Sequence, residues 1–347
     1  MLDVAKRAKV SLSTVSYALN GTRPISEETR RRISKAMEEL DYRPHPLARG
    51  LASKHSRILA ILFPVIERGI GITEFEFINS AAHTASQNGY HLVVWSAETN
   101  EPDELRQLTQ QGLVDGVILM EVHINDPRVN LLRKLEFPFT MIGRCDDDQD
   151  GYVDIDFDGT MEHAIRHLSG LGHTRIAFVN QSQATYDAGY GPVVRTKKAF
   201  EDQTAASGLN GVMRFCRPSP QAGFEACKEL LSEHPELTAI MVMNDRALPG
   251  ILQAIADHNL KIPQDLSVVA LVSSVRMAEM MIPKLTTMEP PGVELGKLAT
   301  ELLINNLEGK SDGSPRIVIP CHLVMGESSG PCNSNTGYQN QQGGKLP

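Results

Sequence analysis

One short stretch near the N-terminus concentrates side chains that can form hydrogen bonds with a nucleic acid. Residues 11–20 contain three serines, one threonine, one tyrosine and one asparagine. Hydroxyl and amide groups can contact phosphate oxygens and the edges of bases, so this stretch is a candidate DNA-binding surface. The sequence has no P-loop, no G-x-S-x-G motif and no H-E-x-x-H motif, so neither an enzyme nor a cofactor is expected.

The spacing of apolar residues predicts two short helices around this stretch, joined by a tight turn at residues 9–11. Apolar residues recur at helical spacing on both sides of the turn, at Val4, Ala5 and Ala8 and at Val15, Ala18 and Leu19. Ser11 is a favourable N-cap, because its hydroxyl can accept hydrogen bonds from free amides of the first turn. With the apolar residues packed inward, Leu12, Ser13, Ser16 and Tyr17 share the exposed face. Such a helix fits the major groove of DNA, although an ordinary helical hairpin would explain the same two helices.

A third helix is expected to follow. Ser26 can cap its N-terminus, and Glu27 and Glu28 place negative charge in the first turn, where it suits the helix dipole. Its apolar stripe consists of Ile33, Ala36, Met37 and Leu40. Pro44 disfavours helix for the residue before it, so the helix should end near residue 41.

These residues resemble, in order and without gaps, the headpiece of the LacI/GalR family of bacterial transcription repressors. The matching positions are Asp3-Val4-Ala5, Ala8, Val10-Ser11, Ser13-Thr14-Val15-Ser16, Leu19-Asn20-Gly21, Ile25-Ser26, Tyr42-Arg43-Pro44 and Leu47-Ala48-Arg49-Gly50-Leu51. The resemblance implies a helix-turn-helix DNA-binding headpiece over residues 1–43 and a hinge over residues 44–57.

The resemblance also implies roles for residues of the headpiece. In this family bases are read mainly from the first two exposed positions of the second helix and from one position a turn later. Those positions correspond to Leu12, Ser13 and Tyr17. Many members carry arginine where this chain has Tyr17, so a different operator half-site is expected. Positions that contact backbone phosphate correspond to Ser11, Thr14, Ser16 and Asn20, and Thr22 and Arg23 are expected to add to them.

The hinge segment contains two prolines, a glycine and two serines, a composition typical of a segment that could be unstructured alone. In the resembled family the hinge folds into a short helix on operator DNA, and a leucine enters the minor groove. Leu51 occupies that position here, with Ala48 one turn before it. An apolar wedge at a base step kinks the duplex. A flexible tether is the alternative for this segment taken by itself.

The length and the net charge of the chain indicate that a larger, acidic part follows this headpiece. The chain has 347 residues, enough for about two or three domains, and a net charge of -8. Residues 1–57 hold 12 lysines and arginines against 6 acidic residues, which suits contact with phosphate. No apolar run of about eighteen residues and no apolar leader occurs, and the five cysteines form no C-x-x-C pair. A bacterial cytoplasmic protein without membrane contact is expected.

From residue 58 the pattern changes to alternating strands and helices, which indicates doubly wound parallel sheets. In the first half, strands are predicted at 58–63, 91–96, 114–120 and 139–143, and helices at 74–88, 101–111 and 127–135. Later strands are predicted at 176–180, 239–243, 267–272 and 317–323, and helices at 159–171, 224–232, 247–258 and 293–307.

The two halves are similar to the lobes of a type I periplasmic-binding-protein core. The resemblance implies that the chain crosses between the lobes near residues 156, 286 and 318. The first lobe would hold about 58–156 and 287–317, and the second about 157–286 and 318–327. Residues 328–347 are rich in Asn, Gln, Gly and Ser and are expected to be disordered.

A two-lobed core binds its ligand between the lobes, beyond the carboxyl ends of the strands. Asn244 ends such a strand and matches a family position whose amide binds the effector. Asp245 either contacts the ligand or caps the next helix, and Pro249 suits the first turn of a helix that starts after residue 245. Val272 stands where many sugar-responsive members carry aspartate, and valine cannot accept a hydrogen bond.

Two arginines are further candidates for contact with a polar or anionic group of the effector. Arg195 lies near the place where the family has an R-x-x-G-[FY] motif, and Arg144 follows a strand of the first lobe. The alternative for Arg144 is a surface salt bridge. His163 and His167 are four residues apart on one predicted helix, but no third ligand is visible, so no metal is expected.

The resemblance implies a transcriptional repressor that binds a pseudo-palindromic operator as a homodimer. A small molecule in the cleft, such as a sugar or a related metabolite, would change its affinity for DNA. A solute-binding protein with the same core, an activator and a ligand-independent regulator are the alternatives. The sequence identifies neither the effector nor the target genes.

Overall fold

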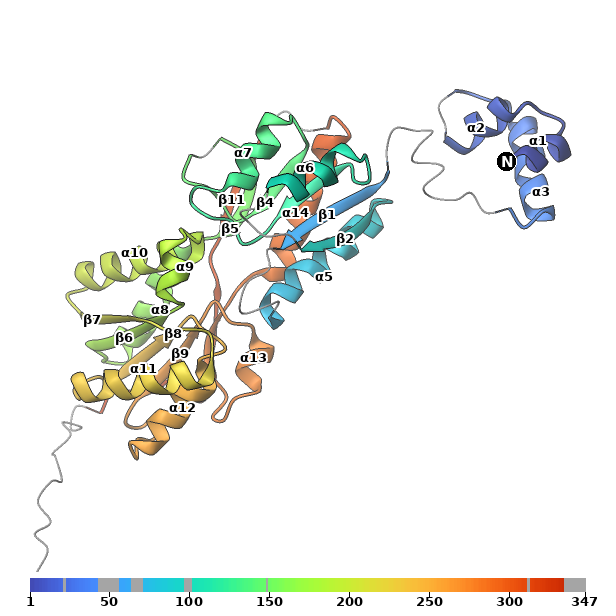
Figure 1. Cartoon of the computed structure of the whole chain (residues 1–347). Helices are drawn as coiled ribbons and strands as arrows, with labels where there is room; N and C mark the ends of the chain where they lie inside the picture. Colours follow the sequence, from blue (N-terminus) through green and yellow to red (C-terminus); the bar gives the residue numbers. More distant parts are fainter. Residues whose placement is uncertain are drawn as a thin grey trace, which may run out of the picture.

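Three helices make up the N-terminal unit of the computed structural model, which describes residues 1–20, 23–42, 56–63, 71–96, 102–147, 149–310 and 313–333. They are α1 (Leu2–Ala8), α2 (Leu12–Asn20) and α3 (Glu27–Glu39) (Figure 1). Each helix contributes at least one fully or almost fully buried residue, Val4, Val15 and Ile33, to a hydrophobic cluster formed by this unit alone. The expected helix-turn-helix unit is confirmed.

Both predicted caps are present in this unit. The Ser11 hydroxyl accepts a hydrogen bond from the amide of Thr14 at 3.1 Å, and the Ser26 hydroxyl accepts one from the amide of Thr29 at 3.3 Å. The prediction that Leu40 belongs to the buried stripe is wrong, because its side chain is 43% exposed. Helix α3 ends at Glu39, and Leu40 is its C-cap residue, so the buried stripe of the helix stops before Leu40.

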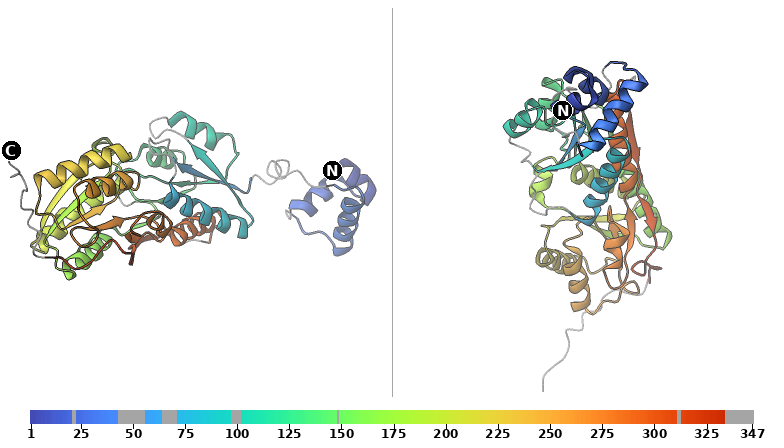
Figure 2. Two further views of the ribbon diagram at one scale, coloured as in Figure 1. Left: turned by 90° about the horizontal axis from the view of Figure 1, so that it is seen from below. Right: turned by 90° about the vertical axis from the view of Figure 1, so that its right-hand side faces the viewer.

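The first lobe is built on a six-stranded sheet in the order β11-β5-β4-β3-β1-β2, with every neighbouring pair parallel. Its strands are β1 (Ile58–Phe63), β2 (His91–Ser96), β3 (Gly116–Leu119), β4 (Phe139–Ile142), β5 (Tyr152–Ile155) and β11 (Arg316–Ile319). Its helices are α5 (Ile72–Gln87), α6 (Pro102–Gln110), α7 (Pro127–Lys134) and α14 (Gly292–Leu307). Alternate residues of β1 enter two different hydrophobic clusters, because helices cover both faces of the sheet (Figure 2).

The second lobe repeats this plan with the order β12-β10-β9-β8-β6-β7, in which only the β12–β10 pair is antiparallel. Its strands are β6 (Arg175–Asn180), β7 (Asn210–Phe215), β8 (Ala239–Val242), β9 (Ser267–Leu271), β10 (Thr286–Glu289) and β12 (His322–Val324). Its helices are α8 (Phe157–Gly170), α9 (Gln183–Asp187), α10 (Gly191–Ala206), α11 (Pro220–Glu233), α12 (Leu248–Asp257) and α13 (Val275–Glu279). The predicted fold class of two doubly wound lobes is confirmed.

The chain crosses between the lobes three times, and two of the crossings come slightly later than expected. Strand β10 pairs with β9 as far as Met288, so residues 287–289 belong to the second lobe rather than the first. The single strand predicted at residues 317–323 is wrong. Strands β11 and β12 lie in different sheets, and Pro320 between them has no amide to continue a ladder.

The C-terminal residues 328–333 are ordered on the second lobe, so the expectation of disorder from residue 328 is wrong for them. The Ser328 hydroxyl accepts from the amide of Thr286 at 2.8 Å and donates to the carbonyl of Val268 at 2.5 Å. The amide of Cys332 donates to the carbonyl of Leu171 at 2.8 Å. The small polar residues of this segment resemble a low-complexity sequence, but here they form hydrogen bonds that hold the segment along the second lobe. Residues 334–347 lie outside the described part of the chain.

None of the helices in the described ranges combines the length and the apolar character that crossing a lipid bilayer requires.

Candidate functional site

The outer face of α2 carries the side chains that the sequence analysis assigns to DNA. Ser11, Leu12 and Ser13 are exposed, and Tyr17 is half-buried, whereas Val15 on the other side of the helix is fully buried. The second helix of the unit therefore has an apolar inner side and a polar outer side. This is the arrangement that a helix needs to enter the major groove with its first turn leading.

Hydrogen bonds fix the start of this helix. The Ser11 hydroxyl lies 2.7 Å from the hydroxyls of both Ser13 and Thr14. Arg32 of α3 donates to the carbonyl of Lys9 at 3.0 Å, which ties the turn between α1 and α2 to the third helix. Arg32 has no assigned role in the sequence analysis, and its contact depends on the packing of α3, which periodicity does not predict.

The structure describes Arg23, Thr14 and Ser16 among the remaining candidates of the headpiece. The guanidinium of Arg23 lies 5.2 Å from the centre of the Tyr17 ring, so it is close to the predicted base-reading position. The half-buried Thr14 and Ser16 belong to α2. The Asn20 side chain, Thr22, Ala48 and Leu51 lie outside the described residues.

A cavity of about 370 Å³ lies between the two lobes, within the size range of sites for small molecules. It is lined by residues at the carboxyl ends of strands in both sheets, where doubly wound proteins bind ligands. Those of the first sheet are Met120, Ile142, Asp154 and Ile155, and those of the second are Gln181, Met243, Asn244 and Val272.

Asn244 and Asp245 both line this cavity, as the sequence analysis expects for effector contacts. The Asn244 amide group donates to the carbonyl of Cys216 at 2.8 Å, which orients the side chain. Asp245 is not the N-cap residue of α12, because that position is occupied by Ala247. Pro249 falls in the first turn of α12, as expected.

Val272 also lines the cavity and has an unusual backbone. It follows the last residue of β9, and its φ of +55° lies in the left-handed region. That region is unfavourable for a β-branched residue, and Val272 adopts it where it lines the cavity.

Arg144 and Arg195 do not line the cavity. Arg144 Nη1 lies 3.1 Å from Asp154 Oδ2, and Arg195 Nη2 lies 3.0 Å from Asp146 Oδ1. The Arg144 pair is largely buried rather than the surface salt bridge considered as its alternative. The Arg195 pair joins α10 of the second lobe to the first lobe. Both arginines therefore already have carboxylate partners next to the cleft.

Acidic groups outnumber basic ones in the cavity. Its lining includes Glu74, Glu121, Asp154 and Asp245, and Arg246 is the one basic side chain among the lining residues described. Asp154 is 4% exposed, and burial raises its pKa to about 6, although Arg144 and Arg195 act in the opposite direction. Asp154 and Glu121 were not among the residues predicted from the sequence, although Asp154 lies in the last two residues of β5 and Glu121 lies two residues beyond β3.

The comparisons with known proteins decide the family. Residues 1–45 match the family described as bacterial regulatory proteins, lacI family, and residues 165–329 match the periplasmic binding protein-like domain. The HTH-type transcriptional repressor PurR of Salmonella newport (strain SL254) is 30% identical over 328 residues, which cover 93% of this chain and 94% of PurR. The chain belongs to the LacI family. Catabolite control protein A of Priestia megaterium is 28% identical over 335 residues, covering 94% of this chain and 98% of the relative.

Solved structures of similar fold are also regulators. The Lac repressor dimer bound to operator and the anti-inducer ONPF has a TM-score of 0.80 at 23% identity, covering 94% of this chain and 98% of that one. The complex of the transcriptional regulator CelR with cellobiose has a TM-score of 0.71 at 24% identity, with the same coverage. This LacI-family protein is a DNA-binding transcriptional repressor with an effector-binding core, and not an enzyme.

Proposed function

We propose that this LacI-family repressor binds a pseudo-palindromic operator as a homodimer and that an uncharged, hydroxyl-rich molecule in the cleft changes its affinity for DNA. A protein with this task works in the bacterial cytoplasm. The observation that carries the proposal is the combination of an outward-facing polar helix with a cleft whose side chains accept hydrogen bonds.

For DNA, we propose that Leu12, Ser13 and Tyr17 contact bases. The proposed phosphate contacts are Ser11, Thr14, Ser16, Asn20, Thr22 and Arg23. The exposed first turn of α2 supports this assignment, and the Lac repressor in a similar fold is bound to operator. Insertion of Leu51, with Ala48, into the minor groove is proposed from the family resemblance alone.

For the effector, the chemistry of the cleft favours a neutral polyol such as a sugar over a phosphorylated molecule. Carboxylates accept hydrogen bonds from hydroxyl groups, whereas they repel phosphate. Arg144 and Arg195, which could attract phosphate, are already paired with aspartates. The cavity is also lined by Phe77, Phe157 and Tyr190, which offer apolar surface to the C–H face of a sugar ring. We propose contacts to Asn244, Asp245 and Val272, with Asp154 as an added acceptor.

For the homodimer, exposed apolar side chains supply a candidate interface. Phe75 of α5 and Met280 beside α13 line one open hollow on the surface and are more than half exposed. Ile282, two residues further, is 93% exposed. Exposed apolar groups of this size usually mark an interaction surface. A second copy of the chain is the proposed partner, because two headpieces are needed to read two half-sites.

The proposal is tested by gel shift with the DNA upstream of the protein's own gene, and by thermal shift with sugars and sugar phosphates. We expect a specific shift at modest salt, and an increase in melting temperature with at least one neutral sugar, because a ligand that binds only the folded state stabilises it. Absence of binding to that DNA would overturn the operator assignment. Stabilisation by sugar phosphates alone would overturn the proposed effector class.

Tyr17→Arg tests the placement of the recognition helix. Arginine can bond to guanine at two points, whereas tyrosine offers one hydroxyl and a flat ring. When bound sequences are selected from a random pool, the preferred base should therefore change at one position in each half-site. The preference for the new base over the old one should be about 1–3 kcal/mol. Lys35→Arg, on α3 and outside the proposed face, is the control and should leave the selected sequences unchanged. Identical selections for Tyr17→Arg and the wild type would contradict the assignment.

A further inference from the structure

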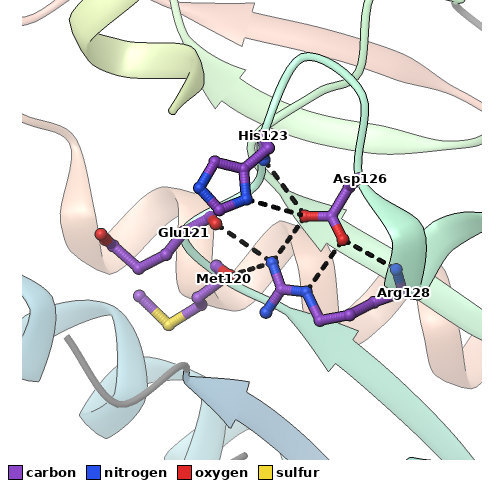
Figure 3. A network of polar contacts seen from close by, with 5 residues as sticks. All are labelled: Met120, Glu121, His123, Asp126 and Arg128. Atoms are coloured by element: carbon purple, nitrogen blue, oxygen red, sulfur yellow. Dashed lines mark hydrogen bonds and ion pairs between the residues drawn. The ribbon is translucent and has the colours of Figure 1, made fainter. Parts of the chain in front are cut away.

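Figure 3 shows an ion pair close to Met120 and Glu121, which follow β3. Residues 120–122 line the cavity and are called its wall below. Asp126 and Arg128 are only 2% and 3% exposed. Arg128 donates from Nε to Asp126 Oδ1 at 3.0 Å and from Nη2 to Oδ2 at 2.7 Å. The two carboxylate oxygens also accept from the backbone amides of Arg128, at 2.9 Å, and His123, at 3.1 Å. Four donors thus hold this carboxylate in one orientation.

The same guanidinium holds the backbone of the wall. Nη2 of Arg128 donates to the carbonyls of Met120 and Glu121, each at 3.0 Å. Glu121 has a φ of +53°, a left-handed conformation that is unfavourable for an L-residue and therefore needs support from its surroundings. Met120, Glu121 and Val122 all line the cavity, whereas neither Asp126 nor Arg128 does.

The residues that follow this wall contact the second lobe. The amide of Ile124 donates to the carbonyl of Gly189 at 2.8 Å, and the amide of Gly191 donates to the carbonyl of Val122 at 3.1 Å. The rings of His123 and Tyr190 meet edge to face, with centroids 6.1 Å apart. Residues 120–124 therefore face the cavity at one end and the second lobe at the other.

We propose that Asp126 and Arg128 form a positioning pair that couples the ligand-facing wall to the contact between the lobes. The functional part of this inference rests on the proposed effector cleft. One ion pair binds the carbonyls of Met120 and Glu121 and the amide of His123. A ligand that displaces the wall therefore moves residues 120–124 together. The displacement then reaches residues 189–191, and the second lobe responds to what the first lobe has bound.

The test is amide hydrogen exchange of the full chain, measured by mass spectrometry without ligand or DNA. Arg128→Lys keeps the charge, but a single ammonium cannot replace the planar guanidinium that binds the carboxylate and two carbonyls together. We expect the amides of Ile124 and Gly191 to exchange about tenfold faster, because their contact opens more often. Amides of β8, in the core of the second lobe, should keep their rates. Gly191 is the decisive site, since it lies in the other lobe.

The matched control is Arg133→Lys on the same helix. Arg133 pairs with Asp147 at 2.6 Å and also with Asp150, and neither of these partners belongs to residues 120–124. This variant should leave the exchange at Gly191 unchanged, and an equal acceleration would overturn the proposal. Unchanged exchange at Gly191 in Arg128→Lys would also overturn it.

A second variant covers the case in which Arg128→Lys does not fold. Asp126→Ser combined with Arg128→Leu keeps a residue that can cap α7 and replaces the buried ion pair by neutral side chains, a change that proteins often tolerate. It removes the clamp on the wall, so Gly191 should again exchange faster while β8 does not. Uniform acceleration, or none, contradicts a positioning role. Because neither DNA nor ligand is used, such a result would leave the proposed repressor function standing.

Discussion

Among single residues, Val272 combines a position in the cavity lining with an unfavourable backbone conformation. Asparagine tolerates the left-handed region better than a β-branched residue does. We therefore predict that Val272→Asn costs about 1–2 kcal/mol less stability than Val212→Asn. Val212 is also half-buried but lies in β7, where valine is favoured. Chemical denaturation of both variants measures the difference, and equal losses would show that the conformation of Val272 stores no strain.

A second prediction at this scale concerns the buried carboxyl of Asp154. Its pKa in the folded protein is about 6, against an ordinary value of 3.8. Between these two pH values the folded state binds more protons than the unfolded state, so stability falls as pH rises from about 4 to about 6. Asp154→Asn should remove this part of the pH dependence of the unfolding free energy.

The control for Asp154 is Asp187→Asn, which changes an exposed aspartate of α9. Unfolding measured at pH 4.5, 5.5 and 7 should give the same pH dependence for this control as for the wild type. If Asp154→Asn also kept the wild-type dependence, then the buried carboxyl would not titrate in this range.

The candidate residues around the cleft were predictable to different degrees. Asn244 and Val272 follow strands whose apolar runs stand out in the sequence, and both line the cavity. Arg144 and Arg195 were poor candidates, because a sequence shows an arginine but not the aspartate that pairs with it. Asp154 was missed for the same reason, since its role depends on burial and on neighbours distant in the chain.

At the scale of elements, α11 and α12 pack with their backbones in close contact. A Cβ on Gly250 would lie 1.7 Å from the carbonyl oxygen of Pro220, which only separation of the two helices could relieve. We predict that Gly250→Ala destabilises the second lobe by about 3 kcal/mol or more. Thermal unfolding followed by circular dichroism measures this loss.

Gly170→Ala is the matched control for that prediction. Gly170 is the last residue of α8, and a Cβ there would meet no atom within 4 Å. This change should be neutral or stabilise by up to about 1 kcal/mol, because alanine favours helix over glycine. A loss as large as that of Gly250→Ala would mean that close helix contact is not the cause.

Most helices and strands were predictable. Those missed include α9, α10 and α13 and the strands β5, β7 and β10, and for α10 the structure gives a physical reason. Helix α10 was missed because two positions of its buried stripe are Thr196 and Thr204, which do not read as apolar. Each threonine hydroxyl donates at 2.7 Å to a carbonyl four residues earlier in the same helix, so it can be buried without another partner. Strands β11 and β12 read as one run, because their separation into two sheets depends on how the lobes assemble.

At the scale of the whole molecule, the proposed dimer depends on the exposed apolar side chains near α5 and α13. Ile282→Glu would place a charge in that interface. We therefore predict that the dissociation constant of the dimer rises at least about tenfold and that the affinity for operator DNA falls correspondingly. Sedimentation equilibrium measures the first effect. Leu113→Glu, at an exposed apolar residue in the turn after α6, is the control and should leave association unchanged. An unaltered dimer in Ile282→Glu would rule out this surface.

The three crossings also determine the order in which the two lobes can complete their folding during translation. The first sheet needs β11, and α5 is covered by α14, whose Gly296 lies so close to α5 that a Cβ would come within 2.4 Å of the carbonyl oxygen of Phe77. Neither segment exists until translation has passed residue 291, by which point β6, β7, β8, β9 and β10 of the second sheet have been made. The second lobe can therefore assemble most of its sheet while the first lobe still exposes apolar surface, which makes the newborn first lobe the part most in need of chaperone protection.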